Sequence, residues 1–288
     1  MSSGGPNGGS AAAVAAGICP MAFSTDYCGS IRISSSFCKL MGFMPSHGTL
    51  PFLQDHYMPL TERRLLRKGF IANTFDDIES LFLPLTGKSA AISQGPYRIA
   101  FSPDLGFLLA EKEVLDHLNR VVEALRIAGH TVELIKPSLD AGILNHFQNI
   151  VAVDRALIIR GSLERKPEFG GKLTDCTRTW LEYAEKVSGI SYAYAETSLG
   201  WVKDKVDETL NGYDFLLTNV SPVRPYPVGQ LPSLVRNTLV DAWGFTLPFN
   251  MSGHPVAAFS GIQLIGKRDA DTSLISAAKL LQAQVAKV

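Results

Sequence analysis

A serine in a short loop of small residues is the strongest candidate for chemistry in this sequence. Ser30 follows Tyr27, Cys28 and Gly29 within STDYCGSIR, at positions 24–32. Such a loop can direct several backbone N–H groups to one point, and a hydroxyl in it can attack a carbonyl whose developing oxyanion those groups stabilise. The residues therefore indicate acyl transfer by a serine, although the G-x-S-x-G elbow is absent around Ser30. Without further pattern, an ordinary loop serine is the simpler interpretation.

The sequence on either side of the loop supplies that pattern. A glycine-rich turn and a run of small residues, GGSAAAVAAG at 8–17, precede the loop, and ISSSFC at 33–38 follows it. Together these stretches resemble the amidase signature family, serine hydrolases that cleave C–N bonds of amides. Four later blocks extend the resemblance over nearly the whole chain: RIAFSPDLG (98–106), YDFLLT (213–218), FTLPFNMSGHP (245–255) and GIQLIG (261–266).

The resemblance implies roles for the residues of the loop. Ser30 takes the position of the nucleophile that forms the acyl-enzyme. The backbone N–H groups of Tyr27, Cys28 and Gly29 take the positions of the oxyanion hole. Cys28 stands where the family usually has glycine, and its side chain crowds the loop if that position requires a positive φ.

Asp26 and Arg32 also match the motif, and we expect them to form a buried ion pair that supports the loop. The alternative is a surface pair, which contributes little to stability. Other positions depart from the family pattern: Ser34 replaces a proline, Lys39 a glycine and Met44 a lysine.

The family's nucleophile belongs to a Ser–cis-Ser–Lys triad, and the bridging serine of this triad has two possible matches. Counting back without gaps from SAAAVAAG places Pro6 and Asn7 at the family's two adjacent serines. Proline has neither a hydroxyl nor an N–H. The other alignment makes Ser3 the possible bridging serine, with residues 6–9 as an insertion. We favour the gapless alignment, because a tight loop tolerates an insertion poorly.

The family's base is a neutral lysine located upstream of the glycine-rich loop. This sequence begins at that loop, so we expect an N-terminally truncated chain that lacks the lysine. Lys39 and Lys68 are near in sequence, but neither stands in a matching context and neither is assigned this role.

The resemblance implies an α/β fold with a mixed β-sheet covered by helices on both faces. We expect a single amidase-like domain over residues 1–288. Its glycine- and serine-rich signature core lies at 1–50, and its central and C-terminal sheet and helices lie at 96–288.

Hydrophobic periodicity points to the same class. Apolar residues recur at helical spacing over 111–127, between strand-like runs at 97–102 and 131–135. This strand–helix–strand order predicts a crossover between parallel strands. A further helix is predicted over 74–85, with Thr74 as its N-cap.

Three expectations concern later residues. Tyr192, Tyr194 and Trp201 are candidates for lining the acyl pocket, but core packing is the favoured interpretation. His254 is expected to be a structural histidine bonded to the backbone. Between VAAFS and GIQLIG the family has more strand than this chain, so we expect exposed backbone groups there unless another segment covers them.

Composition limits the partners. Lys+Arg and Asp+Glu are both 27, which argues against a strongly basic surface for nucleic acid. No run is long and apolar enough for a membrane span, no histidine has metal-ligand spacing, and no cofactor is predicted. The four cysteines form no C-x-x-C pair, and we expect reduced thiols and a cytoplasmic setting. The expected ligand is a small-molecule amide, and a homo-oligomer is possible.

Three functional hypotheses follow. The first is an amidase-like serine hydrolase that cleaves a C–N amide bond through an acyl-enzyme on Ser30. The second is a catalytically inactive amidase relative that serves as a binding or partner subunit. The third is a degenerate fragment.

Overall fold

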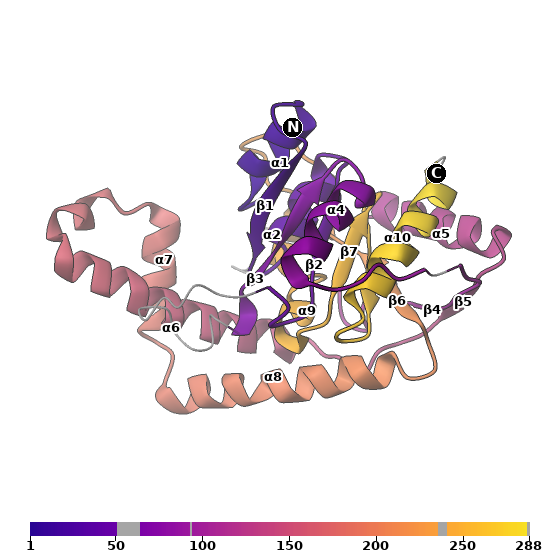
Figure 1. The fold of residues 1–288 in the computed structure, drawn as a ribbon. Helices are drawn as coiled ribbons and strands as arrows, with labels where there is room; N and C mark the ends of the chain where they lie inside the picture. Colours follow the sequence, from indigo (N-terminus) through magenta and orange to yellow (C-terminus); the bar gives the residue numbers. More distant parts are fainter. Residues whose placement is uncertain (51–63, 93, 236–240, 287–288) are drawn as a thin grey trace.

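The computed structural model describes residues 1–50, 64–92, 94–235 and 241–286. Its centre is an eight-stranded mixed sheet in the order β1-β3-β2-β7-β8-β6-β4-β5, with helices on both faces (Figure 1). The α/β class expected from the sequence is therefore confirmed. The strands are β1 (Met21–Asp26), β2 (Met41–Met44), β3 (Arg67–Ala72), β4 (Arg98–Phe101), β5 (Thr131–Leu134), β6 (Phe215–Asn219), β7 (Val256–Phe259) and β8 (Ile262–Gly266).

One edge of the sheet is parallel. β4 pairs in parallel with both β5 and β6, and α5 (Lys112–Ile127) connects β4 to β5. The apolar face of α5 is buried against the sheet through residues such as Leu118 and Val121. The strand–helix–strand unit predicted from periodicity is therefore confirmed. A helix suits this connection, since two parallel strands need a long crossover between them.

The rest of the sheet is antiparallel and includes a very short hairpin. β7 and β8 pair from Val256↔Ile265 to Phe259↔Ile262. Only Ser260 and Gly261 separate the strands, with φ of 49° and 79°, values typical of a two-residue hairpin turn. Because β8 also pairs with β6 along its whole length, the shortened connection leaves no exposed edge at this point.

Helices of different parts of the chain cover the two faces. α4, α5 and α10 pack on one face, and α6, α8 and α9 pack on the other, where α1 and α2 lie beside β2 and β3. α7 lies at the end of α6, away from the sheet (Figure 1). Besides α5, the helices are α1 (Gly8–Ala15), α2 (Ser30–Phe37), α4 (Phe75–Thr86), α6 (Gly142–Arg165), α7 (Asp175–Ala184), α8 (Gly189–Thr209), α9 (Leu247–Ser252) and α10 (Asp271–Val285), with 3-10 turns η1 (Pro167–Lys172), η2 (Ser233–Val235) and η3 (Asp241–Trp243).

A local signal sets the start of α4. Thr74 caps this helix by accepting a hydrogen bond from the backbone N–H of Asp77 at 3.0 Å, so the predicted N-cap is confirmed.

No helix within the described ranges has the length and apolar character of a membrane span.

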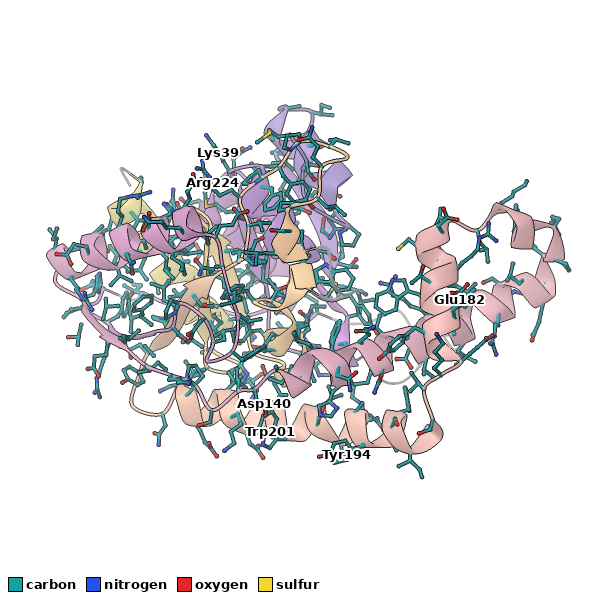
Figure 2. All side chains as sticks on the ribbon, turned by 180° about the vertical axis from the view of Figure 1, so that it is seen from behind. Lys39, Asp140, Glu182, Tyr194, Trp201 and Arg224 are labelled. Atoms are coloured by element: carbon teal, nitrogen blue, oxygen red, sulfur yellow. The ribbon has the colours of Figure 1, made fainter. Side chains whose placement is uncertain are left out.

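The aromatic residues of α8 correct one expectation. Tyr194 is 68% exposed and Trp201 is 38% exposed (Figure 2). Tyr192 is half-buried, and its hydroxyl donates to Asp154 at 2.7 Å. Core packing was therefore the wrong expectation for Tyr194 and Trp201. The sequence of this segment does not reveal which face of α8 meets the sheet.

Candidate active site

Ser30 is the first residue of α2 and follows the loop that leaves β1. Gly29 precedes it as N-cap with a φ of 127°, a conformation that glycine adopts far more readily than other residues. A Cβ at Gly29 would also lie 2.8 Å from Ile33 Cδ1 and 2.9 Å from Thr246 Cβ. The loop therefore requires glycine immediately before the serine. Cys28 is not among the residues with positive φ, so its side chain is accommodated without backbone strain.

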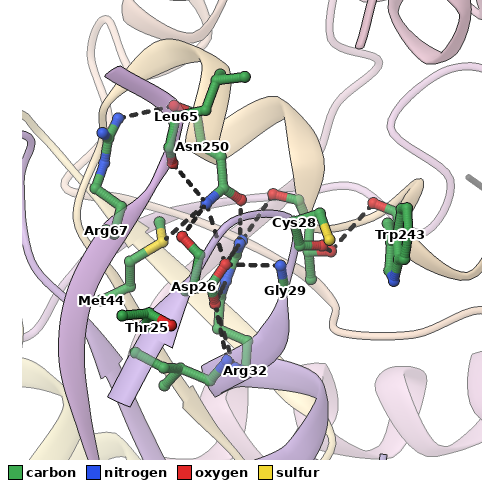
Figure 3. A network of polar contacts seen from close by, with 12 residues as sticks. Thr25, Asp26, Cys28, Gly29, Arg32, Met44, Leu65, Arg67, Trp243 and Asn250 are labelled. Atoms are coloured by element: carbon green, nitrogen blue, oxygen red, sulfur yellow. Dashed lines mark hydrogen bonds and ion pairs between the residues drawn. The ribbon is translucent and has the colours of Figure 1, made fainter. Parts of the chain in front are cut away.

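Asp26 organises the start of α2 (Figure 3). Its carboxylate accepts hydrogen bonds from the backbone N–H groups of Gly29 at 2.6 Å and Ile31 at 3.1 Å. It also accepts two from the Arg32 guanidinium, from Nε at 2.9 Å and Nη2 at 2.8 Å. Both side chains are fully buried. The pair for which the sequence predicts burial thus lies beneath the serine loop, and the surface alternative is excluded.

The electrostatics of this pair favour its charged form. Burial raises the pKa of Asp26, but the charge of Arg32 and the hydrogen bonds from Arg32, Asn250 and Gly29 outweigh burial and lower the pKa overall. A carboxylate that accepts several hydrogen bonds behaves in this way. Asp26 is therefore ionised at neutral pH.

Arg32 and Asn250 connect the loop to residues more than 200 positions away. Arg32 Nη1 donates to the carbonyl of Thr246 at 2.7 Å and to Gln263 Oε1 at 3.3 Å, and Nη2 donates to Asn250 Oδ1. Asn250 Nδ2 in turn donates to the carbonyl of Asp26 at 2.9 Å. The position of Ser30 therefore depends on α9 and β8 as well as on its own loop.

The predicted oxyanion-hole groups are in different situations. The N–H of Gly29 donates to Asp26. Within the described ranges, no acceptor is found for the N–H groups of Cys28 and Ser30. The carbonyl of Cys28 accepts a hydrogen bond from the Thr246 hydroxyl, which fixes the orientation of that peptide. Tyr27 is buried, and its ring lies 5.9 Å from that of Phe147.

A cavity of about 350 Å³ lies beside the serine loop. Cys28 and Ile33, on either side of Ser30 in sequence, line it together with Pro6. The aromatic rings of Trp180 and Trp243 line it as well, stacked at 6.3 Å between centroids. Ser30 itself is 2% exposed. A small molecule in this cavity lies against the loop that carries the candidate nucleophile.

The two candidates for the bridging position lie differently. Pro6 lines the cavity and follows a cis Gly5–Pro6 peptide. Ser3 packs against the start of α1, because a Cβ at Gly8 would lie 2.5 Å from its hydroxyl oxygen, and it is not among the described cavity-lining residues. Among the residues with described positions, none hydrogen-bonds the Ser30 hydroxyl.

Two other titratable side chains, those of His254 and Cys28, are neutral at neutral pH. Burial lowers the pKa of His254 to about 4, and its ring nitrogens bond Ser252 at 2.9 Å and Asp207 at 3.0 Å. These partners are side chains, so the expectation of a backbone-bonded histidine was wrong, although its role is structural. Burial raises the pKa of the Cys28 thiol well above its usual range. In the part of the chain that is described, no three His, Cys, Asp or Glu side chains are arranged to hold a metal ion.

Sequence reasoning missed two residues of this site. Asn250 lies within FTLPFNMSGHP, one of the blocks that resemble the family. The sequence did not predict its hydrogen bonds to Asp26 and Arg32. Arg155, on α6, lines the cavity. Nothing in its sequence context distinguishes it from a surface arginine.

Comparisons with known proteins agree with the resemblance. The family model described as Amidase matches residues 1–275. The chain is 24% identical to a glutamyl-tRNA(Gln) amidotransferase subunit of Thermotoga maritima, over 97% of this chain and 67% of that protein. It is 25% identical to 6-aminohexanoate-cyclic-dimer hydrolase of Paenarthrobacter ureafaciens, over 97% of this chain and 66% of that protein.

Solved structures show the same fold. A crystal structure of an amidase superposes with a TM-score of 0.86 at 25% identity, covering 98% of this chain and 67% of that one. A bacterial aryl acylamidase superposes with a TM-score of 0.82 at 23% identity, covering 98% and 66%. The chain therefore spans about two thirds of the length of the relatives that it matches.

Proposed function

The chain belongs to the amidase signature family, and on that premise we propose that it is a serine hydrolase that cleaves the C–N bond of an amide through an acyl-enzyme on Ser30. The observation that carries this proposal is the placement of Ser30. It lies at the start of α2, on a loop held by the buried Asp26–Arg32 pair. Cys28 and Ile33, two positions before it and three positions after it, line a cavity of about 350 Å³.

The proposed reaction has two stages. The Ser30 hydroxyl oxygen attacks the amide carbonyl carbon and loses its proton, the C–N bond breaks, and the amine leaves with a proton. Water then attacks the ester and releases the carboxylic acid. We assign the N–H groups of Cys28 and Ser30 to the oxyanion, since Gly29 donates to Asp26. Such donors act best when they are fixed in advance, and the bond from Thr246 to the Cys28 carbonyl fixes this peptide.

Proton removal from Ser30 is the step that the described residues do not supply. The resemblance implies a lysine base that acts through a bridging serine, and Pro6 stands at the bridging position in the gapless alignment. Members of a triad act as a unit, and losing one costs on the order of 10⁶-fold in kcat in a well-studied triad.

This gap supports a second candidate function, an inactive relative that binds a ligand or a partner. The relevant observation is that the cavity is formed although no described side chain contacts the Ser30 hydroxyl through a hydrogen bond. The Thermotoga relative is named as one subunit of an amidotransferase, which makes a partner subunit the natural form of this alternative.

Covalent labelling decides between the two. The purified chain is treated with a fluorophosphonate probe and its intact mass is measured, beside Ser30→Ala and the control Ser221→Ala, which changes a serine that lines the cavity. One adduct that is lost only in Ser30→Ala supports the hydrolase. Labelling that persists in Ser30→Ala contradicts the assignment of the nucleophile. A folded but unlabelled chain favours the binding function.

A further inference from the structure

The cavity beside Ser30 contains one charged side chain among its described lining residues, that of Arg155 from α6. The other lining residues are apolar, aromatic or small and polar, and include Phe37, Val223 and Tyr226. A single cation in a mostly apolar cavity gives the site a defined polarity. A ligand that fits it has an apolar body and one negative group.

Aromatic rings hold the guanidinium in place. Arg155 Cζ lies 5.6 Å from the centroid of the Tyr27 ring and 5.9 Å from that of Trp180. Trp180 in turn stacks on Trp243 with an interplanar angle of 14°. Contacts with ring faces orient an arginine while leaving its N–H donors free to bind an acceptor.

These donors have no acceptor within the described part of the chain. Arg155 Nε is buried and has no hydrogen-bond partner there, and no described acidic side chain pairs with Arg155. By contrast, Arg160 on the same helix pairs with Glu185 at 2.7 Å. The neighbouring Asp154 accepts a hydrogen bond from Tyr192. A buried donor without an acceptor costs free energy, and an anionic ligand removes that cost.

The cation also acts on the serine loop. Burial and the charge of Asp26 raise the pKa of the Cys28 thiol, whereas the charge of Arg155 acts in the opposite direction. Arg155 is thus close enough to influence the residue two positions before Ser30. Arg155 and Cys28 both line the cavity, so one small molecule in it can contact both residues.

We propose that Arg155 binds a carboxylate of the ligand, and that the substrate class of this site is amides that carry a carboxylate on an apolar or aromatic body. A guanidinium matches a carboxylate through two parallel N–H···O bonds. The amide part of this proposal rests on the proposed hydrolase function. Recognition of the carboxylate does not, because it needs no catalytic step.

Binding of a matched pair of ligands tests the proposal. Phenylacetate and phenylacetamide have the same body and differ in charge. Their affinities for the Ser30→Ala chain are measured by isothermal titration calorimetry, so that neither is turned over. We expect phenylacetate to bind at least tenfold more tightly. Adding Arg155→Gln should abolish this preference, whereas adding Arg120→Gln, on the exposed side of α5, should leave it unchanged.

Several results would overturn the proposal: equal affinity for both ligands, a preference retained in Arg155→Gln, or no binding of phenylacetate to the folded chain. If Arg155→Gln fails to fold, Arg155→Lys replaces it, and an unchanged preference in that variant contradicts a two-bond contact. Fluorophosphonate labelling of the chain with Ser30 intact tests hydrolysis separately. The two proposals can therefore fail independently.

Discussion

Replacing Arg32 with methionine tests whether the buried pair holds the serine loop. Arg32→Met keeps an unbranched side chain of similar length but removes five hydrogen bonds, made to Asp26, Thr246, Gln263 and Asn250. It also leaves the carboxyl group of Asp26 fully buried without its cation.

The expected loss follows from that burial. Removing one partner of a buried ion pair typically costs about 3–5 kcal/mol, because the other charge remains uncompensated. In domains of 150–250 residues each kcal/mol lowers Tm by about 2–4 °C, so we expect Tm to fall by about 6 °C or more. Because this pair holds the loop that precedes Ser30, labelling of Ser30 should fall in the same variant.

Thermal unfolding followed by circular dichroism measures the effect, with Arg160→Met as the matched control. Arg160 pairs with Glu185 at 2.7 Å, but the two side chains are 56% and 63% exposed, and exposed pairs contribute about 0–1 kcal/mol. The double variant Asp26→Asn/Arg32→Met should lose less than the sum of the two single variants, since neither charge remains.

The reasoning is refuted if Arg32→Met lowers Tm no more than Arg160→Met does. It is also refuted if the double variant loses as much as the two single variants combined. Either result would mean that packing, rather than the compensated charge, determines the stability of the loop.

Two further predictions concern residues around the site. The pKa of His254 is lowered from 6.5 to about 4, so the unfolded chain takes up this proton first. The free energy of unfolding should therefore fall by about 3 kcal/mol as pH drops from about 6.5 to about 4. Urea unfolding at several pH values should show this decrease in the free energy of unfolding, and the decrease should be smaller in His254→Asn. An NMR titration in which His254 of the folded chain takes up its proton near pH 6.5 would contradict the prediction. Gly29→Ala should lower Tm more than Gly17→Ala, because both glycines have positive φ but only Gly29 also meets Thr246 and Ile33; equal losses would show that backbone strain alone matters.

The sequence predicts those parts of the fold that local rules determine. Thr74 caps its helix, and the period of α5 is visible in the chain, because both effects act between residues a few positions apart. Lys39 stands at a glycine position of the family and adopts a φ of 59°. The resemblance therefore pointed to a position where the backbone has a positive φ, which glycine adopts most readily. The two-residue turn at Ser260 was not foreseen, since it depends on strand pairing.

The site itself was predictable only in part, for a physical reason. Asp26, Ser30 and Arg32 lie close together in the sequence, so their spacing carries information. The bonds from Arg32 to Asn250 and the approach of Arg155 depend on how distant segments pack. Packing of this kind leaves no local pattern, and the sequence around an arginine on a helix looks the same whether the side chain faces solvent or a cavity.

The structure separates two properties that a hydrolase combines. The loop network and the cavity need only burial, hydrogen bonds and the Asp26–Arg32 pair, and all of these are present. Hydrolysis additionally needs a path for the proton of Ser30, and no described residue hydrogen-bonds the Ser30 hydroxyl. The carboxylate site that we propose at Arg155 needs no such path, so ligand affinity and covalent labelling must be measured independently.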